Sequence, residues 1–425
     1  MKKAINLRGF QIILIVIISA AIGYFAGTNK VSFDLKNYKP ILAVTSKNPP
    51  PGENLDMKLF YDVLSRVNES YYDKSKLDAK KIEYGAISGM LSSLGDPYTS
   101  FFPPQQNTDF KTTMSGEFSG IGAELSLNSD NIITVISPLD DSPAQKAGVK
   151  AGDMILKVNG ETTSGWDVSK AVDNIRGQKG TPVTLTILHE KSKTPIDVKI
   201  VRDTIVVKSV TGWVKNFSCN NGDCQEDSKG KPVAYIRLSQ FGDKTNDEWQ
   251  SVVNDIHAKS AGKKLSGVIL DLRNNPGGYL SDAVFIASEF LKGGTVVIQE
   301  DGNGNQEPMN VSRVGTLQDE PVIVLINKGS ASASEIVSGA LRDNNRAKLL
   351  GETSFGKGTV QQAEDLDGGG SVHISVAKWL TPNGTWVHHK GLTPDIKVTF
   401  DASKSAKLKS GLDNQLQAAI NEFLK

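Results

Sequence analysis

The chain is poor in the residues that bind metals or build disulfide frameworks. Its 425 residues include 2 cysteines and 5 histidines, and no His-Glu-x-x-His motif occurs. Cys219 and Cys224 have no neighbouring histidine, which makes them a poor zinc site, so we expect neither a metal nor a cofactor. Both cysteines lie in one polar loop, so the sequence is compatible either with a small disulfide or with two free thiols.

An excess of charge of one sign is also missing. The 48 Lys and Arg residues nearly balance the 47 Asp and Glu residues, and the net charge is +1. The basic residues are spread along the chain without long runs. Nucleic-acid binding relies on clustered positive charge, so we expect no nucleic-acid partner.

Only one long apolar run is present, and it lies at the N-terminus. Three basic residues precede an uncharged stretch over 10–26. Its length lies between that of a signal-peptide core and that of a membrane-spanning helix. We therefore expect residues 1–30 to form a membrane anchor or a signal segment, and we favour an uncleaved anchor. The basic flank predicts a single-pass protein of the cell membrane with its main body outside the cytoplasm, or export to the periplasm or cell envelope after cleavage.

The most informative segment is a serine-rich turn between a predicted strand over 322–326 and a predicted helix over 335–341. It reads Ser330-Ala331-Ser332-Ala333-Ser334-Glu335. Unpaired N–H groups at the start of a helix can stabilise an oxyanion that forms beside a serine hydroxyl. The same residues also fit a capping box in which Glu335 returns to the Ser332 N–H. By itself, the turn is compatible both with a catalytic nucleophile and with a simple helix cap.

A second segment, Phe355-Gly356-Lys357-Gly358, places a lysine between two glycines with no acidic residue close in sequence. A lysine can remove a serine proton only where burial lowers its pKa toward neutrality. Gln361 follows four residues later and is placed to hydrogen-bond the amine. Alone, the segment would be a solvated turn, but its combination with the serine run predicts a catalytic pair.

These segments resemble the C-terminal processing peptidases, which are tail-specific serine proteases with a Ser-Lys dyad. The similarity runs through 327–336, Gly351-Glu352 and 355–361. It implies that Ser332 is the nucleophile, Lys357 the general base and Gln361 its supporting residue. It also implies an α/β multidomain fold with a helical N-terminal region, an inserted PDZ domain and a crotonase-like serine protease core.

A further strand, over 268–272, ends in a turn with paired glycines. Read without the resemblance, this turn is an ordinary strand terminator. The resemblance implies that it supplies one oxyanion donor, from Gly278 or alternatively from Gly277. The second donor would be the backbone N–H of Ala333.

Residues 118–204 look like a PDZ domain, with 168–175 as the helix that lines its peptide groove. An extended peptide would add as a strand while its terminal carboxylate binds a nest of amides. The expected partners are therefore proteins or peptides with apolar C-terminal tails. Arg176 ends the groove helix. The sequence is compatible with a role in coupling peptide binding to the active site and with a plain helix cap. The candidate peptide-binding residues are Gly120, Ile121, Gly122 and Ala123.

The rest of the pattern predicts strands over 372–380 and 391–398 beside the site, and a turn at 96–102 whose aromatic residues we interpret as core packing. The amphipathic last helix would pack either on the core or against a second subunit, and the second alternative implies a homo-oligomer. The expected domain order is an anchor or signal segment at 1–30, a linker at 31–54, a helical region at 55–111, a PDZ domain at 112–204, a protease core at 205–398 and a C-terminal helix at 399–425.

Two competing functions can be stated. A Ser-His-Asp triad would need a histidine base, and only His373 lies in an apolar strand that might approach the dyad. A catalytically silent PDZ scaffold that binds the C-termini of envelope proteins would need neither Ser332 nor Lys357. The presence of both, with Gln361, favours a serine-type endopeptidase.

Overall fold

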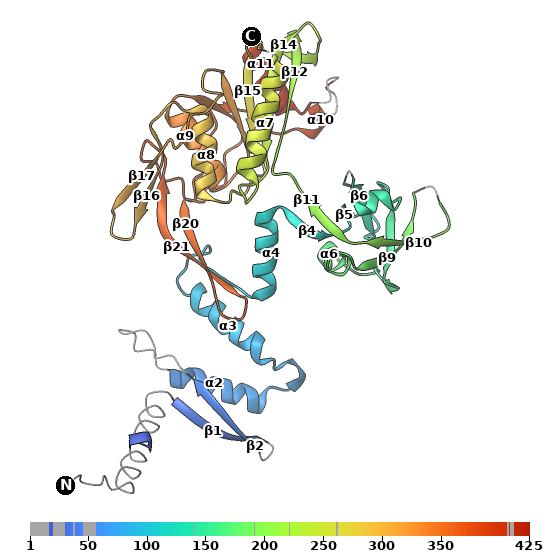
Figure 1. Cartoon of the computed structure of the whole chain (residues 1–425), viewed down its shortest axis with the longest axis vertical. Helices are drawn as coiled ribbons and strands as arrows, with labels where there is room; N and C mark the ends of the chain where they lie inside the picture. Colours follow the sequence, from blue (N-terminus) through green and yellow to red (C-terminus); the bar gives the residue numbers. More distant parts are fainter. Residues whose placement is uncertain are drawn as a thin grey trace, which may run out of the picture. The chain divides into compact units, whose positions relative to one another are not determined.

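The computed structural model describes residues 17–19, 30–36, 39–45, 57–139, 141–190, 192–220, 222–260, 262–405, 408 and 412–425. The chain divides into two compact units, Met1–Ile82 and Glu83–Lys425 (Figure 1). Apart from 17–19, the predicted anchor lies outside the described residues. None of the helices described has the length and apolar character needed to cross a membrane.

The first unit contains a β-hairpin where the sequence predicted a plain linker. Strands β1 (Lys30–Lys36) and β2 (Lys39–Thr45) pair antiparallel. Apolar and polar residues alternate over 31–35, a strand period that the proline content of the segment obscured. Helix α2 (Met57–Ser70) and the short 3₁₀ helix η1 (Lys74–Lys76) follow, and Val63 and Val67 of α2 are exposed.

The second unit begins within α3 (Ala79–Ser92) and continues through β3 (Ser100–Phe102) to α4 (Pro104–Ser115). A proline in the first turn favours the start of α4, and Gly116 ends it in the left-handed conformation (φ 64°). Strand β4 (Glu117–Gly120) then leads into the PDZ domain and pairs with β11 (Asp203–Val206).

The PDZ domain is a β-sheet of order β10-β9-β7-β6-β5, with β8 beside β7. In β9, Val183, Leu185 and Ile187 are fully buried because alternate side chains of a strand face the same side. Strand β5 is an edge strand, and α6 packs against it. The elements are β5 (Ala123–Leu127), β6 (Ile133–Pro138), α5 (Pro143–Lys146), β7 (Met154–Val158), β8 (Glu161–Thr162), α6 (Val168–Ile175), β9 (Pro182–Leu188) and β10 (Ile196–Val201).

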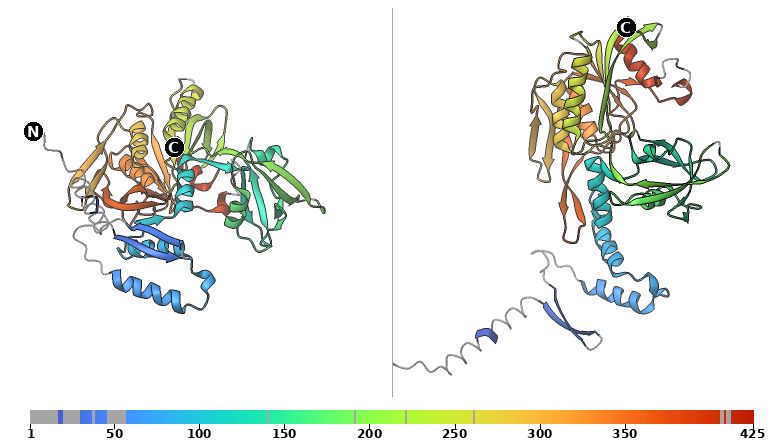
Figure 2. Two further views of the ribbon diagram at one scale, coloured as in Figure 1. Left: turned by 60° about the horizontal axis from the view of Figure 1, so that its bottom comes forward. Right: turned by 45° about the vertical axis from the view of Figure 1, so that its right-hand side comes forward.

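The region predicted to be the protease core is built on a seven-stranded sheet of order β13-β12-β14-β15-β18-β19-β22. This sheet is parallel from β14 to β22. Val268 and Leu270 of β15 pack toward α7, α8 and α9, whereas Ile269 packs toward α11. Helices therefore cover both faces, as parallel sheets require (Figures 1 and 2). The elements are β12 (Val210–Asn220), β13 (Asp223–Glu226), β14 (Lys231–Leu238), α7 (Thr245–Ser260), β15 (Gly267–Asp271), α8 (Leu280–Phe290), β18 (Val322–Ile326), α9 (Ala333–Asp343), β19 (Ala347–Gly351), β22 (Ile396–Lys397) and α11 (Asn414–Leu424).

A second sheet of order β17-β16-β21-β20 lies beside the first, and β3 pairs with β21. The predicted strand over 391–398 is reduced to β22, because Gly391 has a positive φ of 67° and its N–H closes a turn onto Val387. The remaining elements are β16 (Thr295–Asp301), β17 (Gln306–Asn310), β20 (Thr359–Asp365), β21 (Ser371–Leu380) and α10 (Ala402–Ser405).

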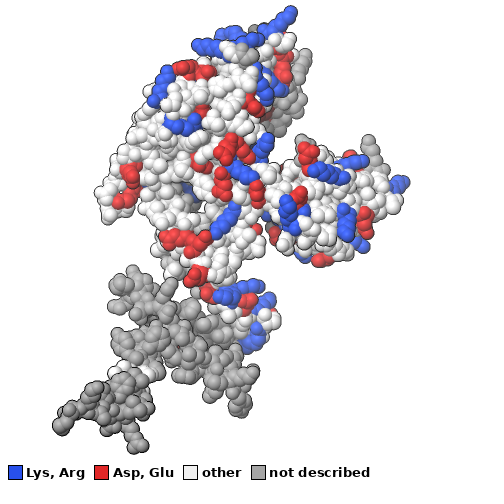
Figure 3. Space-filling view, in the orientation of Figure 1, with Lys and Arg blue, Asp and Glu red and all other residues white. Residues whose placement is uncertain are grey.

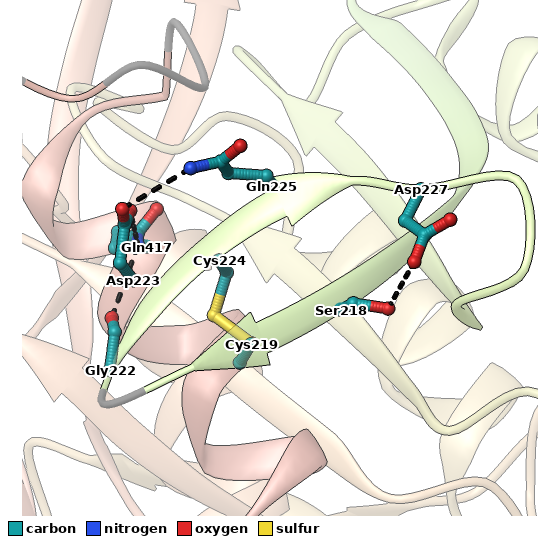
Figure 4. Close-up of a disulfide and its surroundings, with 8 residues drawn as sticks. All are labelled: Ser218, Cys219, Gly222, Asp223, Cys224, Gln225, Asp227 and Gln417. Atoms are coloured by element: carbon teal, nitrogen blue, oxygen red, sulfur yellow. Dashed lines mark hydrogen bonds between the residues drawn. A yellow bond between two sulfur atoms is a disulfide. The ribbon is translucent and has the colours of Figure 1, made fainter.

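Cys219 and Cys224 form a disulfide across the β12–β13 hairpin (Figure 4). The tip of this hairpin contacts the C-terminal helix, because Gln417 of α11 donates to Gly222 O at 3.1 Å and to Asp223 Oδ1 at 3.2 Å. Helix α11 thus packs on the core, which was one of the two alternatives for this segment.

We expect the double substitution Cys219→Ser/Cys224→Ser to lower the free energy of unfolding while leaving peptidase activity intact. For so short a loop, the chain-entropy contribution of the crosslink is about 2 kcal/mol. Denaturant unfolding of the oxidised wild type and the variant measures the difference, with the reduced wild type as control. Loss of activity without loss of stability would contradict this expectation.

Candidate active site

The site forms where three neighbouring parallel strands end. Strands β15, β18 and β19 are hydrogen-bonded in that order, and the turns after them carry the paired glycines, the serine run and the lysine segment. Asn275 joins the first two turns. Its carbonyl accepts from the Ala331 N–H at 3.0 Å and from Ser334 Oγ at 2.9 Å, while its side chain donates to Leu238 O at 2.8 Å.

Ser332 is the N-cap of α9 and adopts φ 53° and ψ −116°. Positive φ is unfavourable for a residue with a Cβ, and such backbone strain is concentrated at functional sites. Ser332 and Lys357 line one cavity of about 1200 Å³. Gln361, Gly278 and Ala333 line the same cavity, so the structure brings the predicted catalytic and oxyanion residues together.

Lys357 is half-buried, and burial lowers the pKa of its amine below the ordinary value while the charge of Asp96 opposes that shift. The Lys357 Nζ lies 5.1 Å from the centroid of the Tyr98 ring. Both Asp96 and Tyr98 belong to the 96–102 turn. Tyr98 lines the cavity, so the interpretation of the aromatic residues of this turn as core packing does not describe its ring. Pairing of β3 with β21 brings the turn to the base, and no local pattern reveals this.

Gln361 lies beside the lysine but directs its amide elsewhere. Its Nε2 donates to Thr359 Oγ1 at 2.8 Å and to Ser375 Oγ at 3.2 Å. Within the described part of the chain, Gln361 makes no recorded hydrogen bond with the Lys357 amine. The supporting role of Gln361 therefore stays a prediction.

The two glycines of the oxyanion turn differ in the state of their N–H groups. The Gly277 N–H donates to Asn275 Oδ1 at 2.9 Å. The N–H groups of Gly278 and Ala333 have no recorded acceptor among the described residues. A Cβ on Gly277 would lie 2.9 Å from Ala333 N, and one on Gly278 would lie 1.7 Å from Phe241 O, so both positions require glycine. This geometry favours Gly278 with Ala333 as the donor pair.

His373, the alternative base, also lines the cavity. Its ring lies between Phe102 and Phe110, with centroids 4.2 and 4.8 Å away, and its Nε2 contacts Ser371 Oγ at 3.2 Å. Burial lowers the pKa of His373, and the Lys357 charge adds to this effect. The ring nitrogen is thus paired with a hydroxyl and not with the carboxylate that a triad requires.

Of the contacts made by Glu335, the sequence predicted only the one with the Ser332 N–H. The Glu335 carboxylate makes the glutamate half of a capping box by accepting from the Ser332 N–H at 2.9 Å, as the sequence allowed. It also accepts from the Lys357 N–H at 2.9 Å. Because Lys357 lies 22 residues further along the chain, only the folded structure could show this second contact.

In the PDZ domain, the predicted peptide-binding residues run from the end of β4 (Gly120) through the loop (Ile121 and Gly122) to the start of β5 (Ala123). The N–H groups of Ile121 and Gly122 have no recorded acceptor in the described ranges. Gly122 has φ 73°, and a Cβ there would lie 2.5 Å from Ser142 Cβ. The loop therefore presents free amides beside the β5 edge strand, a geometry that suits carboxylate binding.

Arg176 is the C-cap of α6, and its N–H donates to Val172 O at 2.8 Å. Its guanidinium lies 5.0 Å from the centroid of Phe118 in β4. Arg176 also lines a second cavity, of about 210 Å³, together with Met114 and Gln240. Since Met114 and Gln240 line the catalytic cavity as well, they form a wall shared by the two cavities.

Charged side chains of both signs are interspersed on the face shown in Figure 3. Among the described residues, oppositely charged side chains form pairs such as Lys179 with Asp203 at 2.8 Å and Lys292 with Asp319 at 2.6 Å. Exposed pairs of this kind contribute little to stability, and they leave no single-signed field on this face.

Comparison with known proteins defines the class first: a serine peptidase that carries a PDZ domain. The model of peptidase family S41 matches residues 232–398, and that of the PDZ domain matches 111–188. A Bacteroides fragilis protein assigned to the S41 proteases shares the fold, with a TM-score of 0.53 and 15% identity, covering 89% of this chain and 98% of that structure.

Two curated relatives define the family further. The carboxy-terminal-processing protease of Bartonella bacilliformis is 43% identical over 340 residues, covering 80% of this chain and 74% of the relative. The carboxy-terminal processing protease CtpA of Bacillus subtilis is 36% identical over 399 residues, covering 94% and 78%. The chain belongs to the carboxy-terminal processing serine proteases of the S41 family.

We expect Asp96→Asn to shift the acidic limb of the kcat/KM pH profile to lower pH. The Asp96 charge favours the ammonium form of Lys357 and so raises its pKa; removing the charge lowers that pKa, and the neutral base persists to lower pH. Asparagine keeps an oxygen for the Tyr98 N–H, which now bonds Asp96 at 3.0 Å. Tyr98→Phe, which preserves the ring, is the control. A shift to higher pH would refute the assignment.

Proposed function

We propose that this chain is an exported endopeptidase that selects substrates by an apolar C-terminal tail and cuts them with a Ser332–Lys357 dyad. The observation that carries the proposal is the shared cavity, in which a half-buried lysine with a lowered pKa accompanies a serine at a helix N-terminus. A PDZ scaffold without activity has no use for such a lysine.

In the proposed mechanism, neutral Lys357 takes the proton of Ser332 as the hydroxyl oxygen attacks the substrate carbonyl. The N–H groups of Ala333 and Gly278 stabilise the resulting oxyanion. Protonated Lys357 then donates to the leaving amine, and the regenerated amine activates the water that hydrolyses the acyl-enzyme. Gln361 supports the base from the neighbouring strand.

Substrate selection is assigned to the PDZ domain. A tail would add as a strand along β5, with its carboxylate on the amides of residues 120–123. Arg176 is the coupling candidate, because it contacts Phe118 in the strand before this loop and lines the smaller cavity, which shares Met114 and Gln240 with the catalytic cavity. Export is supported by the basic flank of the N-terminal apolar run and by the disulfide, which favours an oxidising compartment.

We expect Ser332→Ala and Lys357→Ala each to reduce cleavage of an unfolded reporter with an apolar C-terminal tail by about a thousandfold or more. The wild type should cut the same reporter more slowly when a charged residue ends its tail. Full residual activity in Lys357→Ala would point to another base, and His373→Ala would then be measured. A wild type that binds the tail but never cuts it would support the scaffold.

We expect Arg176→Ala to lower cleavage of tailed reporters while leaving hydrolysis of a short, tailless peptide unchanged, because the arginine touches neither Ser332 nor Lys357. Lys179→Ala, which removes an exposed cation three residues away that pairs with Asp203, is the matched control. Equal loss on both substrates, or no loss on either, would show that Arg176 serves only as a helix cap.

A further inference from the structure

One buried carboxylate joins the nucleophile turn to the base loop. The side chain of Glu335 is fully buried (0% exposed). Oε2 accepts from the N–H groups of Ser332 and Lys357, each at 2.9 Å. Oε1 accepts from Ser354 Oγ at 2.6 Å and from the Gly356 N–H at 2.7 Å. A single oxygen atom therefore bridges the backbones of the two dyad residues.

We propose that Glu335 is a positioning residue that fixes the base loop against the nucleophile turn and so sets the geometry of the dyad. The inference rests on the proposed Ser332–Lys357 chemistry. Glu335 is not a catalytic residue, because it is absent from the lining of the catalytic cavity and all four of its partners are groups of the protein.

A helix cap alone does not account for this arrangement. Capping requires only the contact with the Ser332 N–H, and glutamine serves as well as glutamate there. The other three donors come from Ser354, Gly356 and Lys357, which lie 19 to 22 residues beyond Glu335 in the chain. The carboxylate thus performs a second task that has no part in starting α9.

The second task requires a carboxylate. Every partner of Glu335 is a donor, and an ionised carboxylate has enough lone pairs to accept from all four. Glu335 also lies in the first turn of α9, so these four hydrogen bonds and the helix N-terminus together favour a carboxylate at this position. A glutamine would turn its NH₂ toward the donors of one of the two oxygens and leave at least one backbone N–H without its acceptor.

This arrangement predicts which kinetic constant changes. Because Glu335 does not line the substrate cavity, its replacement should leave KM near that of the wild type. Displacement of Lys357 relative to Ser332 should slow proton removal, and a misplacement of about 1 Å can cost about a hundredfold in rate. The effect should therefore appear in kcat and in the rate of acylation.

The experiment compares Glu335→Gln with Glu352→Gln in the full chain. Glu352 is a half-buried acid in the same loop, and its Oε1 accepts from the Phe400 N–H at 3.0 Å without contacting either dyad residue. We expect Glu335→Gln to lower both kcat on a tailed reporter and the rate of labelling by a fluorophosphonate probe by about a hundredfold. KM should stay within about threefold, and Glu352→Gln should match the wild type.

Labelling of Glu335→Gln at the wild-type rate would overturn the inference, and so would a rise in KM with unchanged kcat. If Glu335→Gln does not fold, Ser354→Ala tests the same point, because it removes one donor to Oε1 and leaves the other three. That variant should label at least tenfold more slowly, and a wild-type rate would again overturn the inference. Ser332→Ala separates the two proposals: if it still cleaves, the dyad itself is wrong, whatever Glu335 does.

Discussion

The parallel alignment of β15, β18 and β19 is the constraint on which the site depends. Parallel neighbours end at the same edge of a sheet, and here the ends are held in register by Leu272 N–H to Leu325 O and by Glu352 N–H to Ile326 O, each at 3.0 Å. The turns that leave these strands carry the proposed oxyanion glycines, the proposed nucleophile Ser332 and the proposed base Lys357. Three segments separated by tens of residues therefore meet without any extended loop, as expected of sites at the carboxyl ends of open α/β sheets.

The end of β15 is held by α11, which packs on the face of the sheet opposite to α7, α8 and α9. Arg273 pairs with Asp271 and also reaches the start of α11. Its Nη2 lies 2.9 Å from Asp413 Oδ2, and its Nη1 donates to Gln415 Oε1 at 2.8 Å. Burial opposes ionisation of Asp271, but hydrogen bonds and charge from Arg273 hold its pKa below the usual range. The C-terminal helix thus belongs to the framework of the oxyanion turn. The disulfide hairpin, through Gln417, contacts the same helix.

Local periodicity was sufficient to predict much of the fold. The predicted strand over 322–326 matches β18, because an uninterrupted apolar run depends on local sequence alone. The helix over 168–175, which the resemblance to a PDZ domain implied, matches α6. Contacts between distant segments were not predictable in this way. Thr99 Oγ1 accepts from the Ser375 N–H across 276 residues, and this pairing carries Asp96 and Tyr98 to the base. The same limit hid the three contacts that Glu335 makes with Ser354, Gly356 and Lys357. The β1–β2 hairpin was missed because prolines outweighed a short alternation.

The electrostatics of Lys357 show why enclosure is central to this chemistry. Burial lowers the pKa of the amine, and the charge of the nearby Asp96 opposes this shift. The Tyr98 ring, 5.1 Å from Nζ, also favours the charged form. The base is therefore poised between desolvation and two features that stabilise the ammonium. A substrate segment that displaces water from the cavity would strengthen desolvation, and it would also strengthen the attraction of the ammonium to Asp96 and to the Tyr98 ring. The balance of these opposing effects sets the fraction of neutral lysine on which the proposed mechanism depends.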